Sequence, residues 1–331
     1  MLELYVKKPM EIEMRDVESL QAPKDDEVKI KISYGGLCGS DLSFLQGKFA
    51  HATYPLRPGH ELVGTIIERG KSAKYEVGTR VVVLPNTFCG ECEMCKKGST
   101  NICRRKKSLG INMDGGFSEE YVISSKFVLP IPDDLANEKA VLIEPFAVVV
   151  SGFKKVKITK DSSVAIVGGG TIGMLAAALA YCLGAHVTAV DVNPKKHEMI
   201  KKIGDIRVVY PEKMADETFD FVIEAAGTKA SVELAIQLMK PGGSMVALGI
   251  APEVNIPFSQ IVRYDQTIYG SIIYNFPDDF LQTIEYLRDP DLNIEPIVSM
   301  VVPFTEYQHA YESALSGDFG KIILNFNSAA H

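Results

Sequence analysis

Hydrophobic and polar positions follow two different rhythms along the chain. Up to about residue 130, short alternating or β-branched runs are separated by glycine and proline, a pattern typical of strands and turns. The clearest predicted strands here are 28–34, 62–67 and 80–84. We therefore expect a compact, loop-rich β domain over residues 1–150.

From about residue 162, short apolar runs alternate with longer helical patterns. Helical periodicity occurs at 172–183, 195–203 and 231–240. Strands that alternate with helices form a parallel doubly wound sheet, so an α/β domain is predicted over 151–274. The strand candidates of this region are 164–167, 186–190, 207–210, 219–224, 245–249 and 267–273.

The remaining stretch, 275–331, contains two helix candidates, 279–287 and 307–315, and a terminal strand at 321–326. It is too short to form a core of its own, so we expect it to return to the first domain. The sequence contains no internal repeat.

Composition excludes several function classes. The 331 residues carry 35 basic and 42 acidic side chains, a formal net charge of −7. This balance argues against nucleic acid or an anionic membrane as a partner. No apolar run is long enough to span a bilayer and no signal peptide precedes the first strand, so a cytoplasmic protein is expected.

A glycine-rich turn follows the apolar run at 164–167. Gly168 permits the tight turn, Gly170 lets the backbone approach a pyrophosphate, and Gly173 lets the following helix pack on the strand. Thr171 and Ile172 begin that helix, whose N-terminal amides attract phosphate. Asp191 ends the next strand, where a carboxylate accepts hydrogen bonds from ribose hydroxyls. This order predicts a dinucleotide site, while a turn that serves only packing is the alternative.

Four of the six cysteines fall within fifteen positions. Four thiolates from one short loop can surround a zinc ion and leave no open position, so this zinc site is predicted to be structural. Free thiols or an iron–sulfur cluster are the alternatives. The four residues are Cys89, Cys92, Cys95 and Cys103.

A second set of metal-binding residue types is dispersed. Cys38 lies in GGLCGSD, His60 and Glu61 in RPGHE, and Glu144 in LIEPF. One thiolate, one imidazole and one carboxylate would leave a fourth zinc position open for water or substrate, as catalysis requires. Spacing alone does not establish this set, because isolated Cys, His and Glu residues more often serve the core or surface.

Taken together in this order, the motifs resemble the zinc-containing medium-chain alcohol and polyol dehydrogenases. The resemblance spans almost the whole chain and adds DGGFSEEYV before the IEP segment. It implies a GroES-like catalytic domain, a Rossmann domain, two zinc ions and NAD. Glu144 in place of a cysteine resembles the sorbitol and threonine dehydrogenase branch, in which either Glu61 or Glu144 can contact the zinc directly.

The same resemblance implies roles for further residues. Ser40 is similar to the hydroxyl residue that takes the substrate proton, and Asp41 to the carboxylate that orients the zinc-binding histidine. Lys321 occupies the position of a basic residue that reaches toward Glu61. Relatives often carry a proton-relaying histidine where this chain has Ser43, and His51 is a possible substitute.

The expected activity is NAD-linked oxidation of a secondary alcohol, either a polyol, a sugar alcohol or its phosphate. Lys48 and Arg57 flank the expected substrate loop and could bind the phosphate of a phosphorylated substrate. The simpler interpretation is that both are charged residues exposed to solvent. L-Threonine is the alternative substrate, a zinc-free quinone or enone reductase the alternative enzyme, and a dinucleotide-binding sensor the non-enzymatic alternative. Relatives imply a homodimer or homotetramer.

Overall fold

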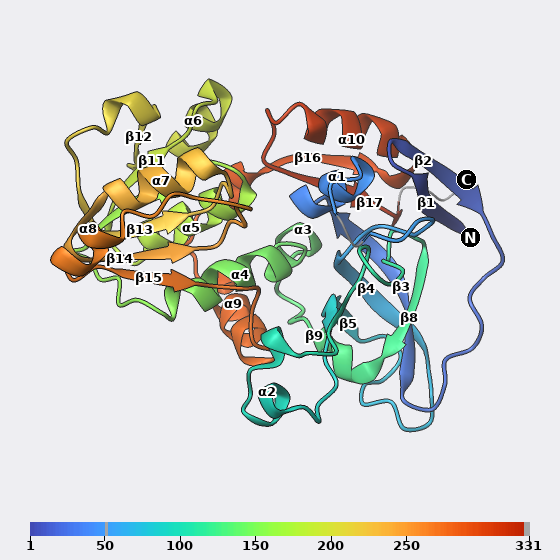
Figure 1. Ribbon diagram of the computed structural model, residues 1–331. Coiled ribbons are helices and arrows are strands. Elements are labelled where there is room, and N and C mark those ends of the chain that lie inside the picture. Colours follow the sequence, from blue (N-terminus) through green and yellow to red (C-terminus); the bar gives the residue numbers. More distant parts are fainter. Residues whose placement is uncertain (50–51, 328–331) are drawn as a thin grey trace. The chain divides into compact units, whose positions relative to one another are not determined.

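Six parallel strands form the centre of residues 145–299 in the computed structural model, which describes residues 1–49 and 52–327 (Figure 1). If the strands are numbered along the chain, their order across the sheet is 3-2-1-4-5-6, which is the doubly wound order. The sheet runs β12 (Arg207–Val209), β11 (His186–Val190), β10 (Ser163–Val167), β13 (Phe219–Glu224), β14 (Met239–Ala247), β15 (Thr267–Gly270).

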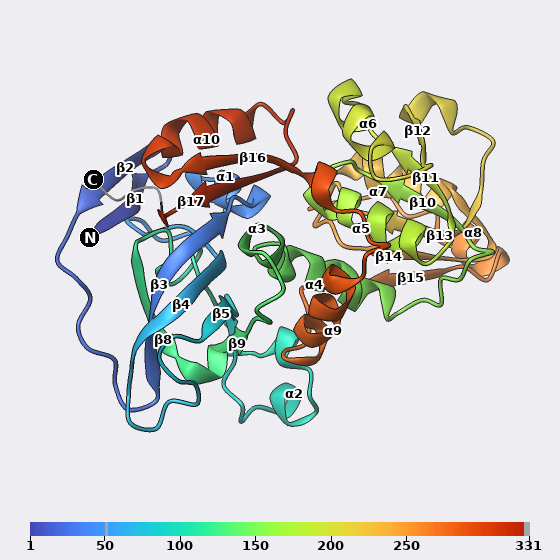
Figure 2. The same cartoon turned by 180° about the vertical axis from the view of Figure 1, so that it is seen from behind.

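Helices cover both faces of this sheet. Helix α5 (Thr171–Cys182) and helix α7 (Lys229–Gln237) both contact β10 and β13, and they do so from opposite faces, as the two views of Figures 1 and 2 show. Strands buried on both faces are apolar throughout, which explains the short hydrophobic runs of the sequence. The other helices here are α4 (Ile143–Phe153), α6 (Pro194–Lys201), α8 (Phe258–Arg263) and α9 (Asp278–Arg288).

A second compact unit comprises residues 1–144 and 300–331. Its larger sheet is antiparallel at most pairings, and β3 occupies the middle, bonded to β4, β8 and β17. Figures 1 and 2 show α10 lying along β16 and β17. Its strands are β3 (Glu27–Gly36), β4 (Glu61–Arg69), β5 (Arg80–Val83), β8 (Glu120–Ser124), β9 (Val128–Pro130), β16 (Val298–Pro303) and β17 (Lys321–Asn325).

Smaller elements complete this unit. Two hairpin-like pairs, β1 (Leu2–Lys8) with β2 (Glu11–Asp16) and β6 (Asn86–Thr87) with β7 (Lys107–Ser108), lie outside the main sheet. Its helices are α1 (Gly39–Leu45), α2 (Glu93–Lys96), α3 (Asn137–Ala140) and α10 (Tyr307–Leu315). No helix in the described ranges combines the length and the apolar character that a bilayer crossing requires.

The structure corrects the predicted domain boundaries and one helix end, and it adds five helices that the sequence analysis did not predict, α1, α2, α3, α4 and α8. The division falls at 144/145 and 299/300, so α9 and residues 275–299 belong with the parallel sheet, not with the returning tail. The predicted helix 231–240 ends at Gln237 because Met239 already begins β14. Helix α4 was not predicted: it is buried nearly all round, so it shows no polar stripe, and its valines favour a strand.

Candidate active site

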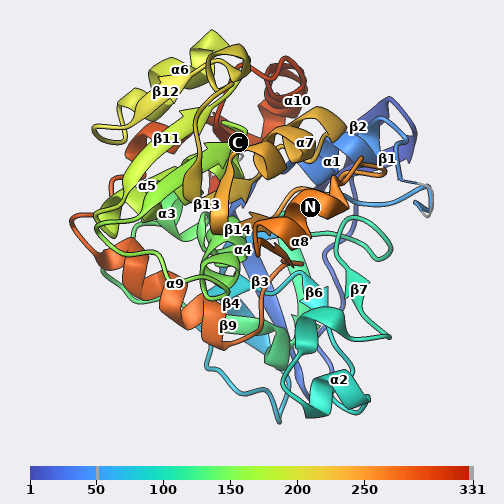
Figure 3. The same ribbon diagram turned by 60° about the vertical axis from the view of Figure 1, so that its left-hand side comes forward.

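The four clustered cysteines converge in the loop that contains α2, at one end of the unit formed by residues 1–144 and 300–331 (Figure 3). Four of their Sγ–Sγ distances are 3.5, 3.6, 3.9 and 3.9 Å. A zinc ion with bonds of about 2.3 Å to four sulfurs places them about 3.8 Å apart. The sulfurs therefore fit one tetrahedral ion, whereas an iron–sulfur cluster distributes its ligands over several irons.

Backbone amides are directed at the same sulfurs. Cys89 Sγ accepts hydrogen bonds from Glu91 N at 3.5 Å and Cys92 N at 3.4 Å, and Cys103 Sγ accepts from Arg105 N at 3.4 Å. The amides lower the pKa of Cys89 to about 6, while burial raises that of Cys95 to about 12. Several thiolates at this spacing need a cation between them, which agrees with a metal site.

A second candidate metal site combines Cys38, His60 and Glu61. One potential ligand atom from each lies within 4.8 Å of the others. Cys38 precedes α1, and β3 and β4 are paired so that Glu61 faces Gly36. A Cβ atom at Gly36 would collide with the Glu61 carboxylate, so the glycine makes room for it.

Asp41 joins the two segments that carry Cys38 and His60. Its Oδ2 accepts from Cys38 N at 3.0 Å, and its Oδ1 accepts from Gly59 N at 3.2 Å. His60 Nδ1 lies 3.3 Å from Asp41 Oδ1, at ion-pair distance but without hydrogen-bond geometry. The contact expected from the sequence is therefore present, and it turns the other ring nitrogen, Nε2, toward Ser40 Oγ at 3.2 Å.

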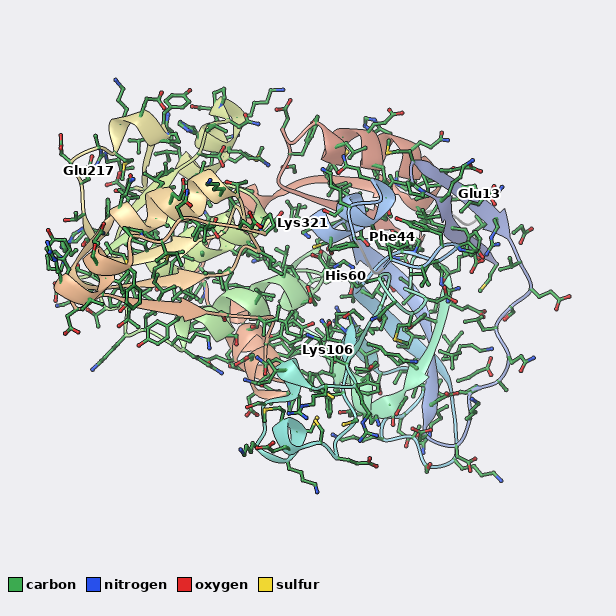
Figure 4. The ribbon with its side chains drawn as sticks, in the orientation of Figure 1. Glu13, Phe44, His60, Lys106, Glu217 and Lys321 are labelled. Atoms are coloured by element: carbon green, nitrogen blue, oxygen red, sulfur yellow. The ribbon has the colours of Figure 1, made fainter. Side chains whose placement is uncertain are left out.

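Lys321 neutralises the buried Glu61. Its Nζ donates to Glu61 Oε1 at 2.6 Å, to Oε2 as well, and to the carbonyl of Leu37 at 2.9 Å. Both side chains are almost fully buried. This confirms the expected contact, and Figure 4 labels Lys321 and His60 within the same unit.

Glu144 stands apart from this three-residue set. It is buried at the beginning of α4 and contributes to the negative field around Lys321. The structure thus brings Cys38, His60 and Glu61 together and does not include Glu144 among these potential ligands.

The charges of this site shift its pKa values. Burial acts to lower the pKa of His60, but the negative charges of Asp41 and Cys38 hold it well above its usual value. Burial likewise opposes the charge of Lys321, yet Glu61, Cys38 and Glu144 raise its pKa. A metal needs neutral imidazole and thiolate, so metal binding here releases protons.

The glycine turn after β10 has the geometry expected of a dinucleotide loop. Gly168 has a φ of 106°, and a Cβ atom at Gly173 would collide with the carbonyl of Gly168. At Gly170 an added Cβ would meet no atom within 4 Å, so space is open beside this backbone. Gly170 is the N-cap of α5, which begins at Thr171.

Asp191 lies beside this turn. Its carboxylate accepts from Gly169 N at 2.5 Å and from Asn193 N at 2.7 Å, which fixes its orientation. It lines a cavity of about 280 Å³ together with Gly168, Val192, Ala226 and residues of the first turn of α7. The cavity lies at the carboxyl ends of β10, β11 and β13, where doubly wound sheets bind ligands.

The structure also bears on the residues predicted to bind a phosphate or to relay a proton. Arg57 is buried, with its guanidinium bonded to Glu3 Oε2 at 2.6 Å and to the carbonyl of Gly115 at 2.5 Å, so it has a structural partner and is not a phosphate-binding side chain. Ser43 lies half-buried on α1, and Lys48 is exposed. His51 lies outside the described residues.

Sequence reasoning missed Glu224. It lies at the end of β13 and is fully buried, and it bonds to the turn that lines the cavity beside Asp191. The only signal in the sequence is a carboxylate at the end of an apolar strand, which no motif marks as functional.

Comparison with known proteins defines the class. Residues 24–133 match the alcohol dehydrogenase GroES-like domain, and residues 171–289 match the zinc-binding dehydrogenase family. The chain belongs to the zinc-binding alcohol and polyol dehydrogenases, oxidoreductases that act on CH–OH groups with zinc and NAD(P) as typical cofactors.

Individual relatives cover nearly the entire chain. An L-threonine 3-dehydrogenase of Legionella pneumophila (strain Corby) is 32% identical over 97% of this chain and 98% of its own length. A sorbitol dehydrogenase of Bacillus subtilis (strain 168) is 32% identical over 90% of both. A zinc-binding dehydrogenase-type structure from Sinorhizobium meliloti 1021, bound to NADP, superposes with a TM-score of 0.90 at 28% identity and covers 98% of both chains.

Proposed function

We propose that this chain oxidises a secondary alcohol group of a polyol or sugar alcohol, with Cys38, His60 and Glu61 as ligands of a catalytic zinc and NAD as the hydride acceptor. The observation that carries the proposal is the convergence of these three side chains, within 4.8 Å, beside the Ser40 hydroxyl. A thiolate, an imidazole and a carboxylate leave a tetrahedral ion one open position.

The chain's own residues then have distinct tasks. Zinc in such a site supplies a Lewis acid that lowers the pKa of a hydroxyl group. Ser40 Oγ, which lies 3.2 Å from His60 Nε2 and so beside the zinc position, accepts the proton of the substrate hydroxyl as it passes its own proton to water. Asp41 keeps that imidazole oriented, and Lys321 holds Glu61 in place. Protons leave through water, because Ser43 cannot relay them as a histidine does.

Four thiolates from Cys89, Cys92, Cys95 and Cys103 hold the second zinc in this proposal. Their Sγ spacing supports a closed tetrahedral site that stabilises the loop and takes no part in the reaction.

NAD is the proposed cofactor because Asp191 stands where the adenosine ribose is expected. Its fixed carboxylate accepts from a 2′-hydroxyl and repels a 2′-phosphate. The Sinorhizobium structure is bound to NADP, so we propose NAD for this chain on the position of Asp191 and not on that neighbour.

The relatives suggest two classes of substrate. Both a sorbitol dehydrogenase and L-threonine 3-dehydrogenases are similar over nearly the whole chain, which makes L-threonine the second candidate. Arg57 is paired with Glu3 and so is not available to a substrate phosphate, which favours an unphosphorylated polyol. The test is kcat/KM with NAD for vicinal diols and polyols, primary alcohols of equal carbon number, and L-threonine. Polyols should rank first, and a preference for threonine or for butanol would reject the polyol assignment.

We also propose that the protein is a homodimer or homotetramer in the cytoplasm. Exposed apolar side chains at Phe258, Val262 and Tyr264, on and directly after α8, support self-association. None of the six cysteines, all of which lie in the described part of the chain, forms a disulfide, as is usual in a reducing compartment. Light scattering coupled to gel filtration measures the assembly.

A further inference from the structure

Glu224 is a buried carboxylate that neither candidate metal site uses. It ends β13 and its side chain is fully buried. Within the described part of the chain, no lysine or arginine forms an ion pair with it. Its Oε1 instead accepts three hydrogen bonds, from Ala226 N at 2.9 Å, Gly227 N at 2.8 Å and Ser231 Oγ at 2.7 Å.

These donors all belong to the turn from β13 into α7. Gly227 has a φ of 67°, and consecutive amides in such a turn converge on a point suited to a negative charge. Ser231 and Thr228 form reciprocal hydrogen bonds of 3.0 and 3.1 Å that cap α7. One carboxylate oxygen therefore connects the strand end, the turn and the first turn of the helix.

The same turn forms part of the dinucleotide cavity. Ala226, Thr228, Ala230 and Ser231 line it along with Asp191. The turn also packs against the glycine loop, since a Cβ atom at Gly168 would lie only 2.8 Å from Ala226 N. A displacement of this turn therefore changes the cavity directly.

The main chain of Glu224 forms hydrogen bonds to a third segment, which follows β14. Its carbonyl accepts from Leu248 N at 2.9 Å and Gly249 N at 3.2 Å, just beyond β14. A Cβ atom at Gly249 would lie 2.6 Å from Glu224 Oε2, so the two are in close contact. Glu224 thus occupies the junction of the segments that follow two neighbouring strands.

We propose that Glu224 is a positioning residue for the dinucleotide: its charge holds the 225–231 turn as a wall of the adenosine pocket beside Asp191. This inference rests on the proposed function, which assigns that cavity to NAD. Because the amides of Ala226 and Gly227 are taken up by Glu224, the phosphate groups obtain their amide donors from the glycine loop and the N-terminus of α5.

The test is the variant Glu224→Gln, which keeps the shape and one acceptor but removes the charge. Charge-assisted hydrogen bonds are about twice as strong as neutral ones, so we expect the Kd values for both NADH and AMP to rise about tenfold. The chain contains no tryptophan, so NADH fluorescence enhancement reports binding without interference, and calorimetry measures AMP. The kcat at saturating NAD and the zinc content should not change.

Gln266→Ala is the matched control. Gln266 is also buried and polar, and its Nε2 donates to the carbonyls of Met239 at 2.9 Å and Lys240 at 3.3 Å, before β15 rather than at the carboxyl edge. The control should lose stability and retain wild-type Kd values. Ser231→Ala removes one of the three hydrogen bonds and should raise both Kd values by about threefold.

Three results would overturn the inference. Folded Glu224→Gln and Ser231→Ala proteins that bind NADH and AMP within twofold of wild type would show a purely structural role. An equal loss in Gln266→Ala would show that the effect reflects stability. If the wild-type protein binds neither ligand, the dinucleotide assignment itself fails, and the role of Glu224 fails with it.

Discussion

Ser40 and Ser43 offer a matched pair at the scale of single residues, since both lie on α1 and only Ser40 contacts His60. Proton transfer by a positioned group contributes about 10²–10⁴-fold to rate. Ser40→Ala is expected to lower kcat by about that factor, and Ser43→Ala to leave kcat within twofold, as measured by NADH formation. Equal losses in both variants would show that the helix, not the Ser40 hydroxyl, is responsible.

Lys321 and Glu61 form a buried pair whose disruption leaves an uncompensated charge. Lys321→Met is expected to lower the free energy of unfolding by about 3–5 kcal/mol, because Glu61 is left buried without a cation. Urea titrations measure this loss, which should be smaller in zinc-replete protein. Lys29→Met is the control: Lys29 is also buried, but its partner Glu68 is half-exposed, so the loss should be clearly smaller.

Asp191 determines cofactor choice if its carboxylate faces the ribose. Asp191→Ala is expected to lower the ratio of kcat/KM for NAD to that for NADP by about 100-fold, since juxtaposed like charges cost several kcal/mol. Asp205→Ala, an exposed carboxylate that does not line the cavity, should leave the ratio unchanged. An unaltered ratio in Asp191→Ala would place the discrimination elsewhere.

At the scale of elements, Asp220 joins three neighbouring strands of the parallel sheet. It accepts from Ser163 N at 2.8 Å and Ser163 Oγ at 2.6 Å on β10, and from Lys240 Nζ at 3.0 Å on β14. Burial acts to raise its pKa, but the hydrogen bonds from Ser163 and Lys240 hold it below the usual value. A carboxylate with a lowered pKa stabilises the fold while it is ionised.

The pH dependence of that contribution follows from the downward shift of the Asp220 pKa on folding. It is complete above the unfolded pKa of about 3.9 and is lost as pH falls through the lower folded pKa. Asp220→Asn should therefore be less stable than wild type at pH 7, by about 1 kcal/mol or less because the pair is part-exposed, and the difference should shrink below pH 4. Urea midpoints between pH 3 and 7 measure it, with Asp216→Asn as the exposed control. A difference that stays constant with pH would contradict this account.

At the scale of the whole molecule, the two candidate metal sites are expected to respond differently to a chelator. Zinc-replete protein should contain two zinc equivalents per chain, and a chelator should remove one and abolish activity while the four-cysteine site resists. Cys92→Ser should retain one equivalent and lose resistance to proteolysis around α2. Metal analysis that finds one equivalent or fewer in fresh wild-type protein would eliminate one of the sites.

Local patterns predicted most elements of the parallel-sheet unit, but in the other unit they located only β3, β4, β5, β17 and α10. The spacing of hydrophobic residues and the positions of glycines located β10, β11, β13 and α5. This works because the residues on one face recur at different intervals in strands and in helices. These patterns did not locate α4, whose helical state depends on burial against its surroundings and not on an amphipathic pattern. The end of α7 was also misjudged, since the change from helix to strand at Met239 depends on pairing with β13.

The sequence by itself determined the family, and its motifs predicted the convergence of the four cysteines and the glycine turn after β10. Each of these depends on residues close together in the chain, where spacing restricts geometry. Only the tertiary structure groups Glu61 rather than Glu144 with Cys38 and His60 and pairs Arg57 with Glu3. The contact between Lys321 and Glu61, which are 260 positions apart, was expected only from the family resemblance. These contacts arise because β-sheet register and loop packing bring together side chains that are far apart in the sequence. A local pattern of residues does not predict such contacts.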